Sequence, residues 1–301
     1  GSYAIIDIND GKVTEISIED IYDADGQFEG FVQAPSGVLE YLSEGKGLRL
    51  PNANWHANFP SSAEQILQFF ALGNKKSIST LIAVNLDYAK LLLNILGDIT
   101  LKDYNTVVDS NNINEVLRSR RSTFFPGSKQ KKHLLSQLLT QLKIEFFNLD
   151  EKLKVQLAKE TFNQLILNNI QLYSTVNEID SIFAKNNFRQ ELKFDVNSEY
   201  LYLVESNVGI NKANKNILRE VTLELGKTSN NLKIKFINNN FPPTISNLYN
   251  LIKTDSNLDP TFSPESPTEN LNYINYQRII IRPNWKINSV KYNNQEITEW
   301  N

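Results

Sequence analysis

The chain has no cysteine and no methionine in 301 residues, and only two histidines. The absence of cysteine excludes disulfides, zinc–thiolate sites and thiol catalysis. Composition gives no physical reason for the absence of methionine. Long apolar runs are missing as well: the longest candidates, residues 81–84 and 91–96, are too short to cross a bilayer. Metal–thiolate chemistry and a membrane-spanning helix are therefore excluded for this sequence.

What remains is the composition of an ordinary globular protein. The net charge is −3 and 41% of the residues are apolar. The one basic cluster, at residues 118–132, is local and the whole chain is slightly acidic, which argues against nucleic acid as a partner. The length is sufficient for two domains, each with its own core.

Residues 1–190 carry the pattern of a layered α/β domain. Strands are expected at residues 3–8 and 13–18, joined by the hairpin turn Asn9-Asp10-Gly11. Ser61 and Glu64 have the spacing of a capping box for a helix that ends at Gly73. The other expected elements are a buried strand at 80–84, a helix ending at Gly97, a long helix at 149–170 and a helix from Asn177.

Residues 194–301 have strand-like segments and no helical patterns between them, which indicates a second, all-β domain. Strands are predicted at residues 200–205, 217–225, 232–237, 273–281 and 287–292, with a final hairpin at Asn293-Asn294. Residues 241–268 are rich in Pro, Asn and Ser and are typical of a long exposed loop. Strands that follow one another without helices favour a β-sandwich.

The segment at residues 109–147 contains the candidate binding site. Two helical patterns flank a Phe-Pro-Gly turn; their apolar stripes are Ile113, Val116 and Leu117, then Leu135, Leu138, Leu139, Leu142 and Phe146. Cations near a helix N-terminus suit a phosphate or another anion, because free N–H groups also point outward there. The candidate anion ligands are Arg118, Arg120, Arg121, Lys129 and Lys131. The alternative interpretation is a solvated basic face.

An acidic loop at residues 19–26 is the candidate metal site. Asp20, Asp23 and Asp25 could hold a hard cation such as Mg²⁺, although the spacing is not that of an EF-hand. Asp and Gly also occur together simply because they suit turns. His56 and His133 lie too far apart in sequence for a pairing to be predicted.

Several stretches together resemble a bacterial family designated DUF4012, a domain of unknown function. The stretches are Gly11-Lys12-Val13, Asp20-Ile21-Tyr22-Asp23, Asn54-Trp55, Phe59-Pro60, Ser62-Ala63, Leu91-Leu92, Gly97, Arg121, Phe124-Phe125-Pro126, Asn211-Lys212-Ala213, Arg219, Asn275-Tyr276 and Arg282-Pro283. The resemblance implies an extracytoplasmic protein anchored in the membrane by a segment upstream of this chain. It implies no established activity. Asn58 departs from the family, which tends to carry an acidic residue there.

A more distant resemblance connects the chain to the LytR-CpsA-Psr phosphotransferases. It is carried by Ile16-Ser17-Ile18 with the acidic loop, by residues 85–97, and by Leu117-Arg118-Ser119-Arg120 with Lys129-Gln130-Lys131. Those enzymes move glycopolymers from polyprenyl pyrophosphate to the cell wall with the help of a divalent cation. In this chain Glu19 and Asp20 stand where a Pro-Arg pair is expected, so a cationic contact is absent.

Three functions are consistent with these patterns. The first is a non-catalytic envelope protein that binds an anionic cell-wall glycan or a polyprenyl-linked glycolipid. The second is an active phosphotransferase, with the arginines on the pyrophosphate and an aspartate on Mg²⁺. The third is a structural surface scaffold. The missing arginine favours the first over the second.

Overall fold

The N-terminal hairpin follows directly from its turn sequence. Strand β1 (Ser2–Asn9) pairs antiparallel with β2 (Lys12–Asp20), with a register irregularity between Asp7 and Ile8. Asp10 and Gly11 have φ angles of 48° and 73°. A two-residue turn with positive φ at both central positions matches the twist of the strands it joins. The predicted hairpin is confirmed.

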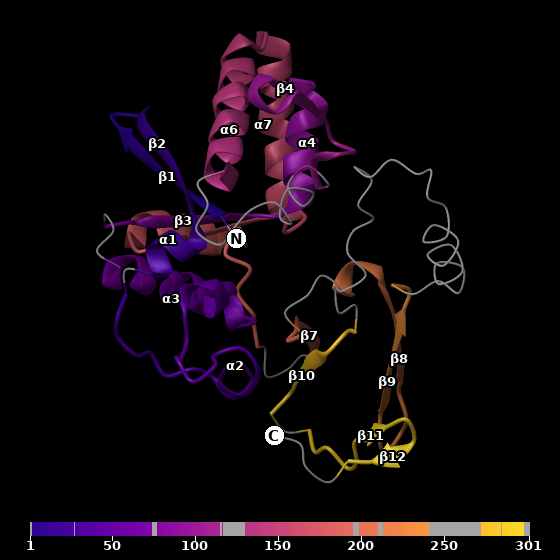
Figure 1. Cartoon of the computed structure of the whole chain (residues 1–301). Helices are drawn as coiled ribbons and strands as arrows, with labels where there is room; N and C mark the ends of the chain where they lie inside the picture. The colour runs from indigo at the N-terminus through magenta and orange to yellow at the C-terminus, as the bar shows by residue number, and fades with distance from the viewer. Residues whose placement is uncertain are drawn as a thin grey trace, which may run out of the picture. The chain divides into compact units, whose positions relative to one another are not determined.

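The computed structural model describes residues 2–26, 28–73, 77–114, 116, 130–194, 199–209, 213–240, 272–283 and 285–297. The chain divides into two units (Figure 1). The first contains Gly1–Leu39 and Gly45–Lys193, and the second contains Glu40–Glu44 and Phe194–Asn301.

The first unit combines helices with short strands. Its helical elements are α1 (Ile21–Asp25), α2 (Ser36–Tyr41, which runs into the second unit), η1 (Leu50–Trp55), α3 (Phe59–Leu72), α4 (Leu86–Leu96), η2 (Lys102–Tyr104), α6 (Gln130–Asn148), α7 (Glu151–Ile166) and α8 (Asn177–Lys185). Its further strands are β3 (Thr80–Val84), β4 (Ile99–Leu101), β5 (Thr106–Val108) and β6 (Ile170–Ser174). Strand β3 pairs antiparallel with β6, and β4 with β5.

Helix α3 begins earlier than the capping-box pattern predicts. It starts at Phe59, with Asn58 at the N-cap and Pro60 in the first turn, where a missing N–H costs nothing. The Asn58 Nδ2 donates to Ser61 Oγ at 3.0 Å, and Asn58 Oδ1 accepts from Leu192 N at 2.9 Å. Asn58 therefore ties the helix start to a distant segment, and the predicted start at Ser61 is wrong. The predicted end at Gly73 is confirmed.

Two other predictions for the first unit are corrected. The helix expected over residues 149–170 ends at Ile166, because Asn168 adopts a left-handed φ of 66° and the chain then enters β6. Strand β3 has the predicted bounds but is not buried: Ile82 and Val84 are more than half exposed, because β6 is its only ladder partner among the described strands. The predicted helix that ends at Gly97 is confirmed, with φ 89° at that glycine.

One core cluster of the first unit joins α6 to a β-hairpin. Its buried members are Leu93, Ile99, Leu101, Val108, Ile113, Leu134 and Leu138. Figure 1 shows α4, α6 and α7 standing side by side, and α4 packs on both of the others. The inward stripe of α6 matches the predicted one in part. The predicted Leu138 is 5% exposed and Leu142 packs against the cluster. Leu134, which was not predicted, is 2% exposed, whereas the predicted Leu139 is 37% exposed.

The second unit is built from antiparallel ladders. Its elements are β7 (Leu201–Asn207), η3 (Ala213–Asn216), β8 (Ile217–Glu224), β9 (Asn231–Asn238), β10 (Asn275–Ile281), β11 (Lys291–Tyr292) and β12 (Gln295–Glu296). β7 pairs with β10, β8 with β9, and β11 with β12. The predicted turn at Asn293 and Asn294 is confirmed, with φ 49° and 64°. The strand expected at residues 287–292 is shorter, since only Lys291–Tyr292 is a strand.

The chain is thus a mixed α/β protein, as predicted. All ladders among the described strands have two strands and are antiparallel. The layered α-β-α arrangement and the β-sandwich stay predictions. No helix within the described ranges is long and apolar enough to cross a membrane.

Candidate functional site

A polar hollow lies on the outer side of α6. We call it the α6 hollow; its volume is about 260 Å³ and its walls are Thr100, Lys102, Asp103, His133, Ser136, Gln137, Thr140 and Gln141. Thr100 comes from β4, the next two residues from η2, and the others from α6. The lining consists of hydroxyl, amide, carboxylate, ammonium and imidazole groups, all of which can hydrogen-bond a polar ligand.

The buried stripe of α6 explains why these side chains point outward. Leu134 and Leu138 pack against Ile99 and Leu101 of β4, which fixes the rotation of the helix. Positions 133, 136, 137, 140 and 141 follow a helical spacing on the adjacent face. The apolar anchor and the polar face therefore come from the same helix, and the core determines which groups line the hollow.

His133 is held between two residues of the β4–β5 connection. Its Nδ1 lies 2.9 Å from the Tyr104 hydroxyl, and its Nε2 lies 3.9 Å from Asp103 Oδ2. Gln137 Nε2 donates to the same Asp103 oxygen. The side chains of His133 and Asp103 are 56% and 60% exposed, so their mutual attraction is screened by water. The arrangement presents charged and polar groups to solvent in a fixed geometry.

Sequence reasoning missed this site. The signal was present as a polar stripe at positions 133, 136, 137, 140 and 141 beside an apolar stripe. The predicted apolar stripe correctly included Leu138 and Leu142, but it also took in Leu135 and Leu139 and left out Leu134, so the polar face was not recognised. The contribution of Asp103 and Tyr104 could not have been found from α6 alone, because they lie about 30 residues upstream.

Most of the predicted anion ligands lie outside the described residues. This applies to Arg118, Arg120, Arg121 and Lys129. Lys131 belongs to the first turn of α6, two residues before His133, and its side chain also lies outside the description. The anion site at these residues stays a prediction.

The acidic loop is divided between strand and helix. Asp20 ends β2 and Asp23 lies in α1, and their side chains are outside the described set. Asp25 faces Arg49: the Arg49 Nε lies 3.2 Å from both carboxylate oxygens, and the Leu50 N–H donates to Oδ1 at 2.9 Å. Among the described residues, no group of three or more His, Asp or Glu could hold a metal ion. The Mg²⁺ site stays a prediction.

Arg49 also has a structural task. Its NH2 donates to the backbone oxygens of Asp25 at 2.7 Å and Phe28 at 3.0 Å, and the guanidinium lies 5.4 Å from the Phe28 ring centroid. These contacts join the end of α1 to the start of η1. Glu19, the first carboxylate of the acidic loop, lies on β2 and accepts a hydrogen bond from the Tyr3 hydroxyl.

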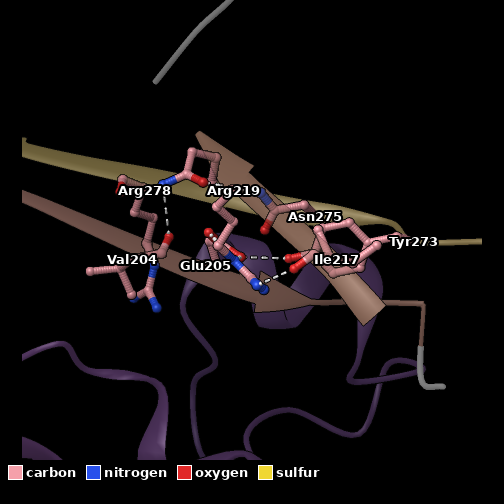
Figure 2. Close-up of polar contacts among 8 residues, drawn as sticks. Val204, Glu205, Ile217, Arg219, Tyr273, Asn275 and Arg278 are labelled. Atoms are coloured by element: carbon pink, nitrogen blue, oxygen red, sulfur yellow. Dashed lines mark hydrogen bonds and ion pairs between the residues drawn. The ribbon is translucent and has the colours of Figure 1, made fainter. Parts of the chain in front are cut away.

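A second polar cluster lies in the second unit. Figure 2 shows Glu205 facing both Arg219 and Tyr273. Arg219 Nε lies 2.7 and 2.6 Å from the two Glu205 oxygens, and the Tyr273 hydroxyl donates to Oε2 at 2.8 Å. Burial, followed by the hydrogen bond to Glu205, raises the pKa of Tyr273 to about 12. The hydrogen bond to Glu205 likewise raises the pKa of Arg219.

This cluster joins the two long ladders of the second unit. Glu205 belongs to β7 and Arg219 to β8, and Tyr273 precedes β10. Nearby, burial lowers the pKa of Arg278, whose NH2 donates to Ser206 Oγ at 3.3 Å. Carboxylate, guanidinium and phenol satisfy one another here, so we assign the cluster a structural role. Two residues of the family resemblance, Asn211 and Lys212, lie outside the described ranges.

Comparison with known families supports the resemblance to DUF4012 over the N-terminal part of the chain. Residues 1–121 match the family model described as "Protein of unknown function (DUF4012)". The match supports this family for the N-terminal part of the chain. The motif residues beyond position 121 lie outside the match. Neither a curated protein nor a solved structure matches the chain.

Proposed function

We propose that this protein is a non-catalytic, extracytoplasmic cell-envelope protein that binds an anionic glycan or its pyrophosphate-linked lipid carrier. The single observation that carries the proposal is the α6 hollow. It is a concave surface lined by polar side chains and fixed to a buried core. Binding sites in proteins are usually largely pre-formed concavities with a few well-placed polar groups.

The sequence beside the hollow supports an anionic partner. Lys131 and Lys132 immediately precede His133, and the basic run that starts at Arg118 leads into the same helix. Lysine and arginine bind phosphate oxygens through charge-assisted hydrogen bonds. A ligand with both sugar hydroxyls and a phosphate could therefore use the hollow and the basic run together.

Location and architecture complete the proposal. We propose that the protein is anchored in the membrane of the cell envelope, as the resemblance to DUF4012 implies; the family model that matches residues 1–121 is described only as one of unknown function. We propose a layered arrangement like that of the LytR-CpsA-Psr enzymes for the first unit. For the second unit we propose a β-sandwich, supported by the Glu205–Arg219 pair between its two long ladders, β7–β10 and β8–β9.

Thermal unfolding of the full chain with a polyprenyl pyrophosphate tests this proposal. A ligand that binds only the native state raises the unfolding midpoint. We expect a higher midpoint for the wild type and no change for the Arg118→Ala/Arg120→Ala/Arg121→Ala variant. The control removes the same charge elsewhere, at the exposed residues Lys152, Lys159 and Lys227, and should respond like the wild type.

The remaining outcomes separate the other functions. A response that requires Mg²⁺ would favour the phosphotransferase, because a cation is part of that chemistry. No response at ligand concentrations well above micromolar would contradict the proposal and leave the structural scaffold.

A further inference from the structure

We infer that the α6 hollow recognises the hydroxyl groups of an uncharged sugar ring, and that the anionic part of the glycan binds outside it. The inference rests on the proposed function, because it divides one glycan ligand between two places. It assigns a role to Asp103, a residue that sequence patterns did not single out.

The charge of the hollow argues against a phosphate inside it. The Asp103 carboxylate forms part of the wall, and it lies 3.9 Å from the imidazole of His133. A phosphate placed among these residues would meet a like charge at close range. Among the described lining residues Lys102 is the one lysine or arginine, so its ammonium and the Asp103 carboxylate offset each other. The described lining is therefore nearly neutral, unlike the basic run that precedes His133 in the sequence.

The lining does match sugar hydroxyls. A hydroxyl both donates and accepts, so it can donate to a carboxylate while it accepts from an ammonium or an amide. Asp103 Oδ2 is occupied by Gln137, and within the described part of the chain its Oδ1 makes no hydrogen bond. Lys102, Ser136 and Gln141 also make no side-chain hydrogen bond to another described residue. Acceptor and donors therefore face the same small space.

The existing contacts hold these groups in place. Gln137 fixes one oxygen of Asp103, and the Tyr104 hydroxyl fixes the ring of His133, with the two rings 5.8 Å apart. Groups that are already oriented lose less conformational freedom when a ligand binds. The hollow is thus prepared for hydrogen bonds without a rearrangement of α6.

The size of the hollow sets the size of the ligand. Its volume of about 260 Å³ lies below the range of about 300–1,000 Å³ that is typical of pockets for drug-sized ligands. One sugar ring, rather than a long stretch of polymer, suits this space. Because the lining is mostly exposed, we expect a dissociation constant on the order of millimolar.

Nuclear magnetic resonance of the histidine side chains tests the inference on the full chain. His56 and His133 are the only histidines, so a His56→Gln variant assigns the two ring signals. The probes are neutral oligosaccharides of N-acetylglucosamine, glucose, galactose and mannose, and inorganic pyrophosphate. We expect at least one oligosaccharide to shift the His133 signal, whereas pyrophosphate leaves it unchanged.

The Asp103→Asn variant gives opposite signs for the two kinds of ligand. If Asp103 accepts a sugar hydroxyl through its charge, the variant weakens oligosaccharide binding about tenfold. If the hollow holds an anion, loss of the carboxylate removes repulsion and strengthens pyrophosphate binding. Asp87→Asn is the matched control, since its carboxylate is exposed on α4 and outside the hollow. It should not change either affinity.

Three results have different consequences. Pyrophosphate that shifts His133 and binds the Asp103→Asn variant more tightly overturns the inference. A His133 signal that no oligosaccharide moves also overturns it, even where polyprenyl pyrophosphate raises the unfolding midpoint and the proposed function stands. An oligosaccharide shift that Asp103→Asn weakens supports the inference, even if the pyrophosphate part of the proposed function fails.

Discussion

At the scale of single residues, Asp25 shows how a side chain can look like a ligand in the sequence and have a protein partner in the structure. Its carboxylate stands in an acidic loop, which suggests a cation. In the fold it faces Arg49, which lies 24 residues further on. Both side chains are largely buried, at 14% and 22% exposure. The residues next to Asp25 in the sequence give no sign of Arg49, so the acidic pattern alone could not predict this ion pair.

We predict that Arg49→Ala destabilises the protein by about 2–3 kcal/mol, because it leaves a largely buried carboxylate without its cation and two backbone oxygens without a donor. Arg49→Lys should restore only part of the loss, since lysine lacks the guanidinium fork. Urea unfolding measures both. As a control, Lys154→Ala removes an exposed ion pair to Glu151 and should cost less than about 0.5 kcal/mol. Equal losses for Arg49→Ala and Lys154→Ala would refute the structural role.

At the scale of elements, the hairpin turn and the glycine helix ends predicted from local sequence were confirmed, whereas the capping-box start at Ser61 was wrong. The pairing of strands far apart in the chain was not predicted. The Asn9-Asp10-Gly11 turn and the glycine after α4 depend on nearby backbone conformation, so the sequence contains all that is needed to place them. The ladder of β3 with β6 places Thr80 opposite Ser174, far along the chain. The two strands are not joined by a hairpin turn, so no local signal predicts that they pair. The helix predicted over residues 149–170 ran past the end of α7 to the start of β6, because the sequence gives no sign that β6 pairs with β3.

The register of α6 is the element on which the candidate site depends. Leu134 and Leu138 face the core, whereas the sequence pattern also admits a stripe through Leu135 and Leu139. The two stripes differ by one residue, about 100° around the helix axis. A leucine-rich helix has apolar residues on both stripes, so hydrophobic periodicity alone cannot tell which stripe faces the core. The choice is made by β4 and β5, which cover one side of the helix.

A comparison of leucine truncations tests this register. Leu134→Ala should lower the free energy of unfolding by about 2–4 kcal/mol, because it leaves a cavity in the core. Leu139→Ala, at a residue 37% exposed, should cost less than about 1 kcal/mol. Both free energies can be obtained from urea unfolding curves. A larger loss at Leu139 than at Leu134 would show that the helix is turned the other way, and the α6 hollow would then lose its lining.

At the scale of the whole molecule, the order of the predicted strands and helices favoured a mixed α/β protein, and the length allowed two domains. The structure has two units, and the long segment of the second begins at Phe194. Composition could not predict that residues 40–44 belong to the second unit, because that assignment depends on contacts far along the chain, such as that of Tyr41 with Tyr276. Nor could it show how the ladders within the second unit are joined through Glu205 and Arg219.

The two units are each compact by themselves, so they should unfold separately. We predict two transitions in scanning calorimetry of the full chain, because domains that have their own cores generally behave as cooperative units. Leu134→Ala should lower the midpoint of one transition, and Arg219→Ala should lower the other by a few degrees. Lys235→Ala, which removes an exposed pair with Glu220, is the matched control and should move neither. If both variants lower one shared transition, the units unfold as a single cooperative body, and a ligand bound to α6 would then also stabilise the second unit.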